Sequence, residues 1–400
     1  MKLRKLTANL VKNKRVIFRV GYDVPLSKKG KNFVVADDSR IKASLETLKF
    51  LQKNNAKIII LTWLKRPDGT VVEDLRLDPV AKHLAQLIKH SVYKLDDCVG
   101  KEVEGFVNEM EGGDIIVLEN VRFHKEEDKN STTFAKQLAR LGDVVVFDAF
   151  SHAHRDVAST TGILKLLPGV AGFSMTKEVT ILSKLLGTVK HPFTVVFGGA
   201  KVSDKIGILE RFLPRADHIL IGGAMAHAFL DAKEIALGKS LREKYADKAH
   251  HTTRSVALRI LKDATAGQII LPTDLIATNT SMGRYRTVEL TKDKIKSDEI
   301  FVDIGPYTTR AFGRIIKQSK TLFWNGPMGL FEKKPFDKGT AAIARAVALN
   351  KGMTVLGGGD TQRAVNTAKL AEKYTYVSTG GGASLDFLAH GTLPVIEYLK

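Results

Sequence analysis

Short apolar runs rich in Val and Ile recur along the chain, and amphipathic stretches separate them. The runs do not alternate apolar with polar residues, which is typical of parallel strands covered on both faces. In the first half we expect strands at 15–20, 57–62, 114–118 and 143–148. In the second half we expect them at 193–198, 217–222, 268–271, 321–325, 353–357 and 374–378.

Between these runs, apolar residues recur at helical spacing. In the segment 39–52, Ile41, Leu45 and Leu48 fall on one side, and Ser39 is a candidate N-cap. Further helices are expected at 132–141, 205–213, 340–349 and 361–372. Strand–helix alternation in both halves predicts an α/β fold with two doubly wound, mostly parallel, Rossmann-like domains.

The domain boundary is expected where Leu167-Pro168-Gly169 precedes a helical stretch at 176–186. We predict an N-terminal domain at 1–165 and a C-terminal domain at 187–385, joined by a hinge helix at 166–186. Residues 386–400 form a tail that we expect to return to the N-terminal domain. A helix that joins two domains is a natural place for hinge motion.

Composition excludes several classes of protein. Of the 400 residues, 44% are hydrophobic and 26% charged, with 33 Gly and 11 Pro, so the chain is neither disordered nor collagen-like. Cys98 is the only cysteine, which excludes an internal disulfide and favours a reducing compartment. There is neither a signal-peptide pattern nor an apolar run of about 20 residues. We therefore expect a soluble, cytoplasmic protein.

The formal net charge is +19, from 62 basic and 43 acidic residues. Such an excess favours anionic partners. Nucleic acid, a phosphorylated metabolite with its nucleotide, and a compositional bias without any partner all remain open at this point.

Glycine-bearing loops follow four predicted strands in the second half, at 198–201, 222–224, 357–360 and 380–383. Glycine allows backbone N–H groups to approach a phosphate, and a helix N-terminus adds a favourable dipole. The dinucleotide fingerprint and the Walker A motif are both absent. Four such loops in one domain nevertheless indicate a phosphate-binding site.

Charged residues beside these loops suggest specific contacts. Lys201 and Lys205 are four residues apart, so one helix can direct both at one phosphate. Asp360 suits a Mg²⁺ ligand, because a metal that is also bound to phosphate needs few protein carboxylates; a helix N-cap is the alternative. Glu332, behind the dense loop 324–329, suits ribose hydroxyls or is a surface acid.

Arginines take the place of glycines at the predicted strand ends of the first half. They are Arg19, Arg40, Arg66, Arg122 and Arg155. Guanidinium groups bind phosphate and carboxylate bidentately, so this set predicts a convergent anion site.

Taken together, these motifs resemble the phosphoglycerate kinase family over essentially the whole chain. The matching segments are 198–206 (GGAKVSDKI), 324–327 (WNGP), 357–361 (GGGDT), 378–384 (STGGGAS), 119–124 (ENVRFH) and 153–155 (AHR). The resemblance implies a nucleotide-binding C-terminal domain that faces an acid-substrate domain, with Mg²⁺ and ATP or ADP, and 3-phosphoglycerate or 1,3-bisphosphoglycerate as the partners.

The resemblance also implies site residues. Nucleotide contacts map to Gly199, Ala200, Lys201, Lys205, Asn325, Glu332, Gly357, Gly358, Gly359, Asp360 and Thr361, with Asp360 on the metal. Acid-substrate contacts map to Arg19, Gly21, Tyr22, Asp23, Arg40, Trp63, Leu64, Lys65, Arg66, Arg122, His154 and Arg155. The catalytic group is Arg40 and Lys201, with helix N-termini near Gly358 and Gly381.

Departures from the family pattern gather in the acid-substrate site. The family's Arg-Val-Asp-Phe-Asn-Val-Pro is here RVGYDVP at 19–25, so Gly21 replaces an aspartate and Asp23 replaces an asparagine. Its Ser-His-Leu-Gly-Arg-Pro is here TWLKRP at 62–67, which introduces Trp63 and Lys65, and Ser151 stands in place of a glycine. Each lost hydrogen bond to a charged ligand costs about 1.5–3 kcal/mol.

Phosphoryl transfer needs positioning and charge neutralisation more than a general base. We find no Ser/His/Asp order and no metal-ligand cluster in the sequence, and nothing that requires more than a monomer. Three hypotheses follow. The chain is a working, divergent phosphoglycerate kinase whose two domains close about the hinge, a paralogue that acts weakly or on another small carboxylate, or a non-catalytic polyanion-binding protein.

Overall fold

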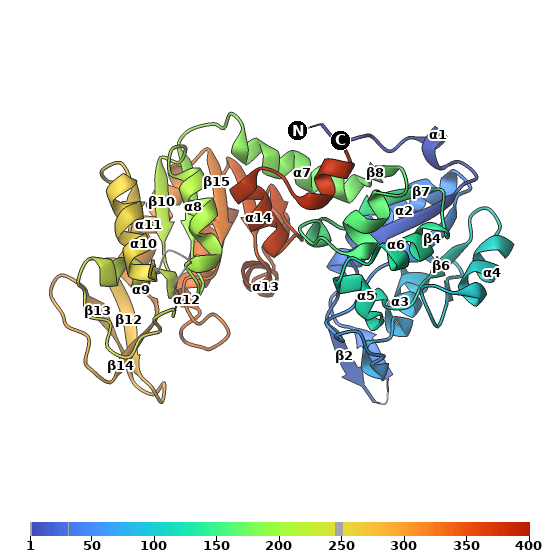
Figure 1. The fold of residues 1–400 in the computed structure, drawn as a ribbon. Coiled ribbons are helices and arrows are strands. Elements are labelled where there is room, and N and C mark those ends of the chain that lie inside the picture. The colour runs from blue at the N-terminus through green and yellow to red at the C-terminus, as the bar shows by residue number, and fades with distance from the viewer. Residues whose placement is uncertain (1, 31, 245–250) are drawn as a thin grey trace. The chain divides into compact units, whose positions relative to one another are not determined.

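The computed structural model describes residues 2–30, 32–244 and 251–400 (Figure 1). It divides into two compact units: Met1–Ile181 with Thr392–Lys400, and Leu182–Gly391. Helix α7 (Phe173–Leu186) carries the chain from the first unit to the second. Within the described ranges, no helix has both the length and the apolar character that a membrane span requires.

Unit 1 is built on a six-stranded parallel sheet in the order β5-β6-β4-β1-β7-β8. Its strands are β1 (Arg15–Val20), β4 (Lys57–Leu61), β5 (Tyr93–Lys94), β6 (Ile115–Val117), β7 (Val144–Asp148) and β8 (Gly169–Ala171). Its helices are α1 (Ala8–Val11), α2 (Ser39–Lys53), α3 (Asp78–Ile88), α4 (Lys101–Glu109), α5 (Lys125–Asp128) and α6 (Thr132–Ala139), and a hairpin pairs β2 (Leu26–Lys29) with β3 (Asn32–Val35).

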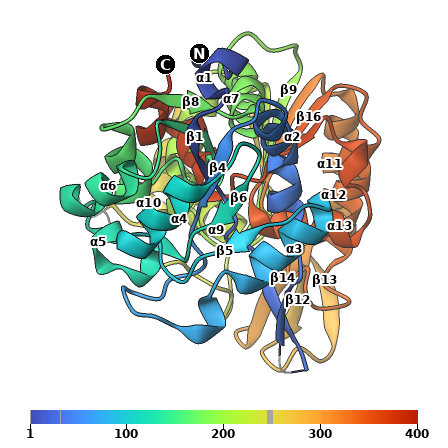
Figure 2. The same cartoon turned by 90° about the vertical axis from the view of Figure 1, so that its right-hand side faces the viewer.

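Helices cover both faces of this sheet (Figure 2). On one face, Phe18 and Ile60 join a single buried cluster with Leu48 of α2 and Leu84 of α3. In Figure 2, α5 and α6 lie on the side of the sheet away from α2 and α3. Because both faces are covered, the strands are buried along their length and read as continuous apolar runs.

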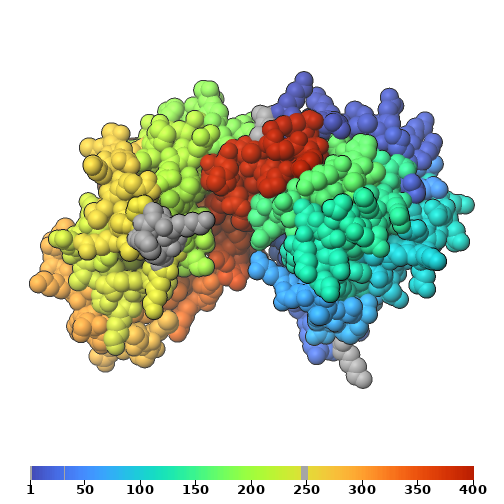
Figure 3. All heavy atoms as spheres, viewed as in Figure 1, coloured from blue at the N-terminus to red at the C-terminus, as the bar shows by residue number. Residues whose placement is uncertain are grey.

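The C-terminal residues complete unit 1. Helix α14 continues to His390, so the segment that belongs to unit 1 begins at Thr392 rather than at residue 386. The backbone N–H of Val395 donates to the carbonyl of Ala153 at 3.2 Å. In the space-filling view the last residues, red, lie against the green atoms of this unit (Figure 3).

Unit 2 repeats the plan with a parallel sheet in the order β11-β10-β9-β15-β16-β17. Its strands are β9 (Phe193–Phe197), β10 (His218–Ile221), β11 (Ile269–Ile270), β15 (Thr321–Asn325), β16 (Met353–Gly357) and β17 (Tyr376–Val377). Its helices after α7 are α8 (Ile206–Phe212), α9 (Met225–Ala232), α10 (Thr253–Asp263), α11 (Pro306–Gln318), α12 (Lys338–Ala348), α13 (Gly359–Thr367) and α14 (Gly382–His390).

A second, antiparallel sheet in unit 2 was not predicted. It pairs β12 (Asp274–Asn279) with β13 (Tyr285–Glu289) and β14 (Glu299–Ile304) in the order β13-β12-β14. Charged residues lie inside β13 and β14, and β12 begins with Asp274 and ends with Thr278 and Asn279, so none of the three gives a long apolar run.

The predicted α/β class with two mostly parallel sheets is confirmed, and each predicted strand lies within two residues of its position. Two local expectations were wrong. Ser39 is the first residue of α2 and not its N-cap, because its N–H and hydroxyl both bond to the side chain of Asp37. The helix between the units starts at Phe173, because Gly169–Ala171 pairs with β7 as strand β8.

Candidate active site

A cavity of about 320 Å³ in unit 2 gathers the loops that follow β9, β15 and β16. Its lining includes the predicted residues Gly199, Ala200, Lys201, Lys205, Asn325, Gly358, Gly359, Asp360, Thr361 and Gly381. Gly357 is not among the lining residues; its carbonyl accepts a 3.0 Å hydrogen bond from the side chain of Asn325. The glycine loops, the two lysines and the aspartate therefore surround one space.

Two helices begin at this cavity. Helix α13 starts directly after Gly358, and α14 starts directly after Gly381. The unpaired N–H groups and the dipole of a helix N-terminus favour a bound phosphate. Gly358 has a φ of +94°, and a Cβ there would lie 2.5 Å from Nδ2 of Asn325. The close packing beneath α13 therefore requires glycine at this position.

Lys205 is buried at the edge of the cavity, whereas Lys201 is exposed. The Nζ of Lys205 donates to the carbonyl of Lys201 at 3.3 Å, and burial lowers its pKa. Glu243 accepts hydrogen bonds from the backbone N–H of Val202 at 2.7 Å and of Ser203 at 3.2 Å. Glu243 thus fixes the loop that holds both lysines, and no sequence signal links it to this loop 40 residues earlier.

The carboxylates of Asp360 and Glu332 both pair with the guanidinium group of Arg363. A single nitrogen of Arg363 lies 2.9 Å from Oε1 of Glu332 and 3.2 Å from Oδ1 of Asp360. Asp360 is the second residue of α13, whose N-cap is Gly358, so the N-cap alternative for Asp360 was wrong. The Asp360 carboxylate stays largely exposed at the cavity, where it can serve as an oxygen ligand for Mg²⁺. Arg363 was not predicted.

A second cavity, of about 450 Å³, adjoins the first and shares Gly199, Ala200, Pro327 and Asp360 with it. Apolar side chains line much of it, among them Leu275, Phe301, Met328, Leu330 and Phe331. Glu332 lies on its wall. An apolar cavity next to the glycine-lined cavity can accept a nucleobase, and Glu332 on its wall can contact a ribose. The sequence did not predict this apolar cavity, because β12 and β14, which contribute residues to its wall, were not predicted.

In unit 1, the loops that carry the acid-site prediction follow β1, β4, β6 and β7, which are neighbours in the sheet. Backbone carbonyls join them: Nη1 of Arg122 donates to the carbonyl of Lys65 at 2.8 Å, and Nη1 of Arg40 donates to that of Asp23 at 2.5 Å. These contacts bring Arg40 and Arg122 to the same end of the sheet.

The departures from the family pattern compensate one another in pairs. The Asp23 carboxylate accepts the backbone N–H of Lys65 at 3.0 Å and lies 3.9 Å from its ammonium. The new acid is therefore paired with the new base and not with Arg19. A Cβ on Gly21 would lie 2.9 Å from Oγ of Ser151, so the smaller residue at 21 makes room for the larger one at 151.

Trp63 is only 3% exposed and lies between two guanidinium groups. Its ring is 4.3 Å from Arg19 and 4.2 Å from Arg122, and it stacks on His152 with 3.8 Å between ring centroids. Cation–π contacts of this kind contribute about 0.5–2 kcal/mol each. Trp63 thus positions Arg122 through a cation–π contact, and this contact replaces a hydrogen bond to a substrate.

Three predicted substrate contacts have buried side chains that are committed to the core. Nε of Arg19 donates to the carbonyl of Ser159 at 3.1 Å, and the hydroxyl of Tyr22 pairs with that of Ser44 at 2.7 Å. Leu64 is fully buried, and both of its backbone polar groups bond to one asparagine side chain. These residues support the acid-site loops, and their contact with a substrate stays a prediction.

The remaining predicted residues form a cationic region. Arg66 and Arg155 are exposed, and His154 is half-buried. Burial lowers the pKa of His152 well below its usual value, and the nearby charges of Arg19, Arg40, Arg122 and His154 lower it further. The arginines that surround this imidazole make the region cationic, which suits an anionic ligand.

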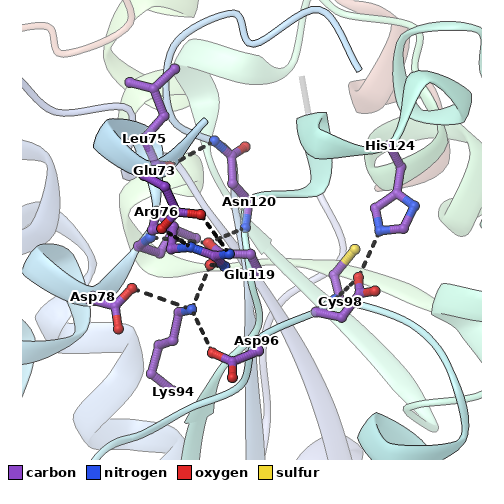
Figure 4. Close-up of polar contacts among 12 residues, drawn as sticks. Glu73, Leu75, Arg76, Asp78, Lys94, Asp96, Cys98, Glu119, Asn120 and His124 are labelled. Atoms are coloured by element: carbon purple, nitrogen blue, oxygen red, sulfur yellow. Dashed lines mark hydrogen bonds and ion pairs between the residues drawn. The ribbon is translucent and has the colours of Figure 1, made fainter. Parts of the chain in front are cut away.

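Glu119 was missed as a positioning residue (Figure 4). Its buried carboxylate accepts the backbone N–H groups of Leu77 at 3.0 Å and Asn120 at 2.8 Å, and it pairs with Arg76 at 3.0 Å and Lys94 at 2.5 Å. The side chain of Asn120 then bonds to both backbone groups of Leu64 and accepts the N–H of Arg122. This network fixes the loop that carries Arg122.

Comparisons with known proteins agree with this geometry. The family model described as phosphoglycerate kinase matches residues 6–390. A phosphoglycerate kinase from Dictyoglomus turgidum is 45% identical over 393 residues, which is 98% of this chain and 96% of the relative. One from Pelotomaculum thermopropionicum is 44% identical and covers 97% of each. The solved structure of the Coxiella burnetii enzyme has a TM-score of 0.84 at 33% identity, covering 100% of this chain and 99% of its own.

Proposed function

The chain belongs to the phosphoglycerate kinase family and transfers a phosphoryl group reversibly between 1,3-bisphosphoglycerate and ADP; we propose that the two site regions described above hold these two substrates. The homology supports the kinase hypothesis and neither the altered paralogue nor the polyanion-binding protein. The observation that carries the assignment of sites is the cavity lined by glycine loops, two lysines and two helix N-termini.

The nucleotide occupies unit 2 in this proposal. Its base enters the apolar cavity near Phe301, its ribose meets Glu332, and its phosphates meet Lys201 and Lys205. Asp360 is the ligand that would hold Mg²⁺, an ion that neutralises phosphate charge when bound. Arg363 contacts only Oδ1 of Asp360, so Oδ2 would remain available to hold the ion.

The acid substrate occupies unit 1. Its proposed contacts are Arg40, Lys65, Arg66, His154 and Arg155, whose side chains are partly or fully exposed, together with Arg122, which is 8% exposed. A carboxylate nucleophile is already deprotonated, so no general base is needed. Lys201 and Arg40, with the helix N-termini at Gly358 and Gly381, neutralise the charge on the phosphoryl group in transfer.

The two sets of residues belong to different compact units, so transfer requires the units to bring their substrates together. Helix α7 is the connection we propose as the hinge, because it spans the boundary between Ile181 and Leu182. Closure also excludes water, which would otherwise hydrolyse the acyl phosphate. We propose a cytoplasmic monomer, in keeping with the single buried cysteine.

The test is a coupled assay with 3-phosphoglycerate and MgATP, combined with direct measurement of ADP binding. We expect Lys205→Ala to weaken ADP binding tenfold or more. Arg40→Ala is expected to lower kcat about 10²- to 10³-fold with ADP binding unchanged. Lys317→Ala, on the exposed side of α11, is the matched control and should change neither quantity. Full turnover by Arg40→Ala, or ADP binding that ignores Lys205, would contradict the assignment.

A further inference from the structure

A cluster of three metal-ligating side chains lies outside the substrate and nucleotide sites. Asp97, Cys98 and His124 each offer one ligand atom, and the three atoms lie within 4.8 Å of one another. Asp97 and Cys98 precede α4, and His124 is the N-cap residue of α5. Figure 4 shows the thiol of Cys98 and the imidazole of His124 on the same side of the sheet, directed toward each other. Sequence spacing did not reveal the cluster, because 25 residues separate Cys98 from His124.

Local contacts hold the three donors in place. Oδ1 of Asp97 accepts the backbone N–H of Cys98 at 2.6 Å and lies 2.7 Å from Nε2 of His124. The imidazole also stacks on Phe134, with 5.0 Å between ring centroids. Cys98 is buried whereas Asp97 is exposed, so an ion from solvent reaches the cluster on the Asp97 side.

A tetrahedral ion requires the three ligand atoms, which lie within 4.8 Å of one another, to shift. Zinc bonds of about 2.0–2.3 Å place neighbouring ligand atoms roughly 3.2–3.7 Å apart. The Asp97–His124 pair at 2.7 Å must open by about half an ångström, which small rotations of these two partly exposed side chains allow. One sulfur, one imidazole nitrogen and one carboxylate oxygen suit Zn²⁺ or Co²⁺ and not Mg²⁺ or Ca²⁺, which select oxygen.

We propose that Asp97, Cys98 and His124 bind one Zn²⁺-class ion, with a water molecule as the fourth ligand. The thiol of Cys98 loses its proton to solvent as the metal–sulfur bond forms, and His124 binds through a neutral ring nitrogen. The ion joins the segment before α4 to the start of α5. Since His124 follows Arg122 by two residues, bound metal also stiffens the loop that presents this arginine. The site is independent of nucleotide chemistry.

The test uses the full, untagged chain without nucleotide and titrates it with Co²⁺. A thiolate ligand produces a sulfur-to-cobalt charge-transfer band in the near ultraviolet, and tetrahedral Co²⁺ gives intense visible bands. We expect both bands to saturate at one equivalent and to disappear when Zn²⁺ is added. Competition with a chromophoric chelator then measures Zn²⁺ affinity, which should fall at least tenfold in His124→Gln and in Cys98→Ser.

A matched control is available in unit 2. His191 and Asp217 form the same kind of pair, with Nδ1 and Oδ2 2.6 Å apart, but the only cysteine of the chain is elsewhere. His191→Gln should leave the Co²⁺ spectrum and the Zn²⁺ affinity unchanged. Asp360→Asn should also leave them unchanged, because it removes the proposed Mg²⁺ ligand. Absence of the charge-transfer band in the unaltered chain, or equal loss of affinity in His191→Gln, would overturn the proposal.

Discussion

Restoring an aspartate at position 21 tests whether the departures in the acid site are coupled. The Cβ of Gly21→Asp would lie 2.9 Å from Oγ of Ser151, closer than real Cβ contacts, and 3.7 Å from Ala149. Ser151 must therefore move, at a cost of about 1–2 kcal/mol typical of local overpacking. Ser151→Ala removes only the contacting oxygen, so the double variant should recover this free energy.

The same pair of substitutions should separate stability from substrate affinity. A carboxylate that accepts a substrate hydroxyl in this charged site is worth about 1.5–3 kcal/mol, which corresponds to a roughly tenfold to hundredfold lower KM for 3-phosphoglycerate. We expect this gain in the double variant, and little of it in Gly21→Asp alone, where Ser151 displaces the new side chain. The KM for MgATP should not change.

Each unit contains one of the two tryptophans, so tryptophan fluorescence can follow the unfolding of one unit at a time. In a Trp324→Phe background, the fluorescence of Trp63 reports urea unfolding of unit 1 alone. Coupling of about 1–2 kcal/mol between the substitutions at 21 and 151 supports the steric argument. Additivity within about 0.5 kcal/mol, or a KM for 3-phosphoglycerate unchanged by the double variant, would refute it.

Two further predictions concern unit 2. Burial raises the pKa of Asp303 to about 7, so the folded state binds an extra proton between about pH 4 and 7 and its stability falls as pH rises through that window. Between pH 5 and pH 8 this loss of unfolding free energy is at most about 2.7 kcal/mol, and Asp303→Asn should remove it. The measurement is urea unfolding followed by Trp324 fluorescence at the two pH values, and an unchanged difference between them would contradict the assignment. Gly358→Ala places a Cβ 2.5 Å from Asn325 at a φ of +94° and should raise KM for MgATP tenfold or more in the coupled assay. Gly267→Ala, which has a φ of +78° but whose Cβ would meet nothing within 4 Å, is its control, and equal effects at both positions would contradict the steric reason.

The parallel sheets were predictable because a strand buried on both faces has apolar residues at consecutive positions in the sequence. Strands β1, β9 and β15 are almost wholly buried, and each contains a run of three bulky apolar residues, at 16–18, 195–197 and 322–324. Strands β12 and β13 have partly exposed positions and carry charged residues, and the two-residue β5 is too short to leave a pattern. Their pairing depends on partners distant in sequence.

The glycine-bearing nucleotide loops could also be predicted from residues that are close together in the sequence. A glycine between a strand and a helix is a local requirement, as the positive φ of Gly358 and Gly381 shows. The apolar cavity near Phe301 was not readable, because its wall combines the antiparallel sheet with a loop some 25 residues later. Glu243 and Arg363 act only through contacts that the fold creates.

In the acid site, the sequence predicted the arginines but not the burial or direction of each side chain. Arg19 and Arg122 both follow the pattern of an arginine near a strand end, yet Arg19 is wholly buried whereas Arg122 keeps 8% of its surface exposed. Which way each side chain turns depends on Trp63, which separates them.

The order of apolar runs, glycine loops and basic residues therefore determined the fold class, the two parallel sheets and the chemistry at the strand ends, because each of these depends on residues close together in the chain. Tertiary structure alone decided which charges meet. Asp23 with Lys65, Gly21 with Ser151, and the Asp97–Cys98–His124 cluster bring together residues from separate loops, since packing and charge pairing act through space and not along the sequence.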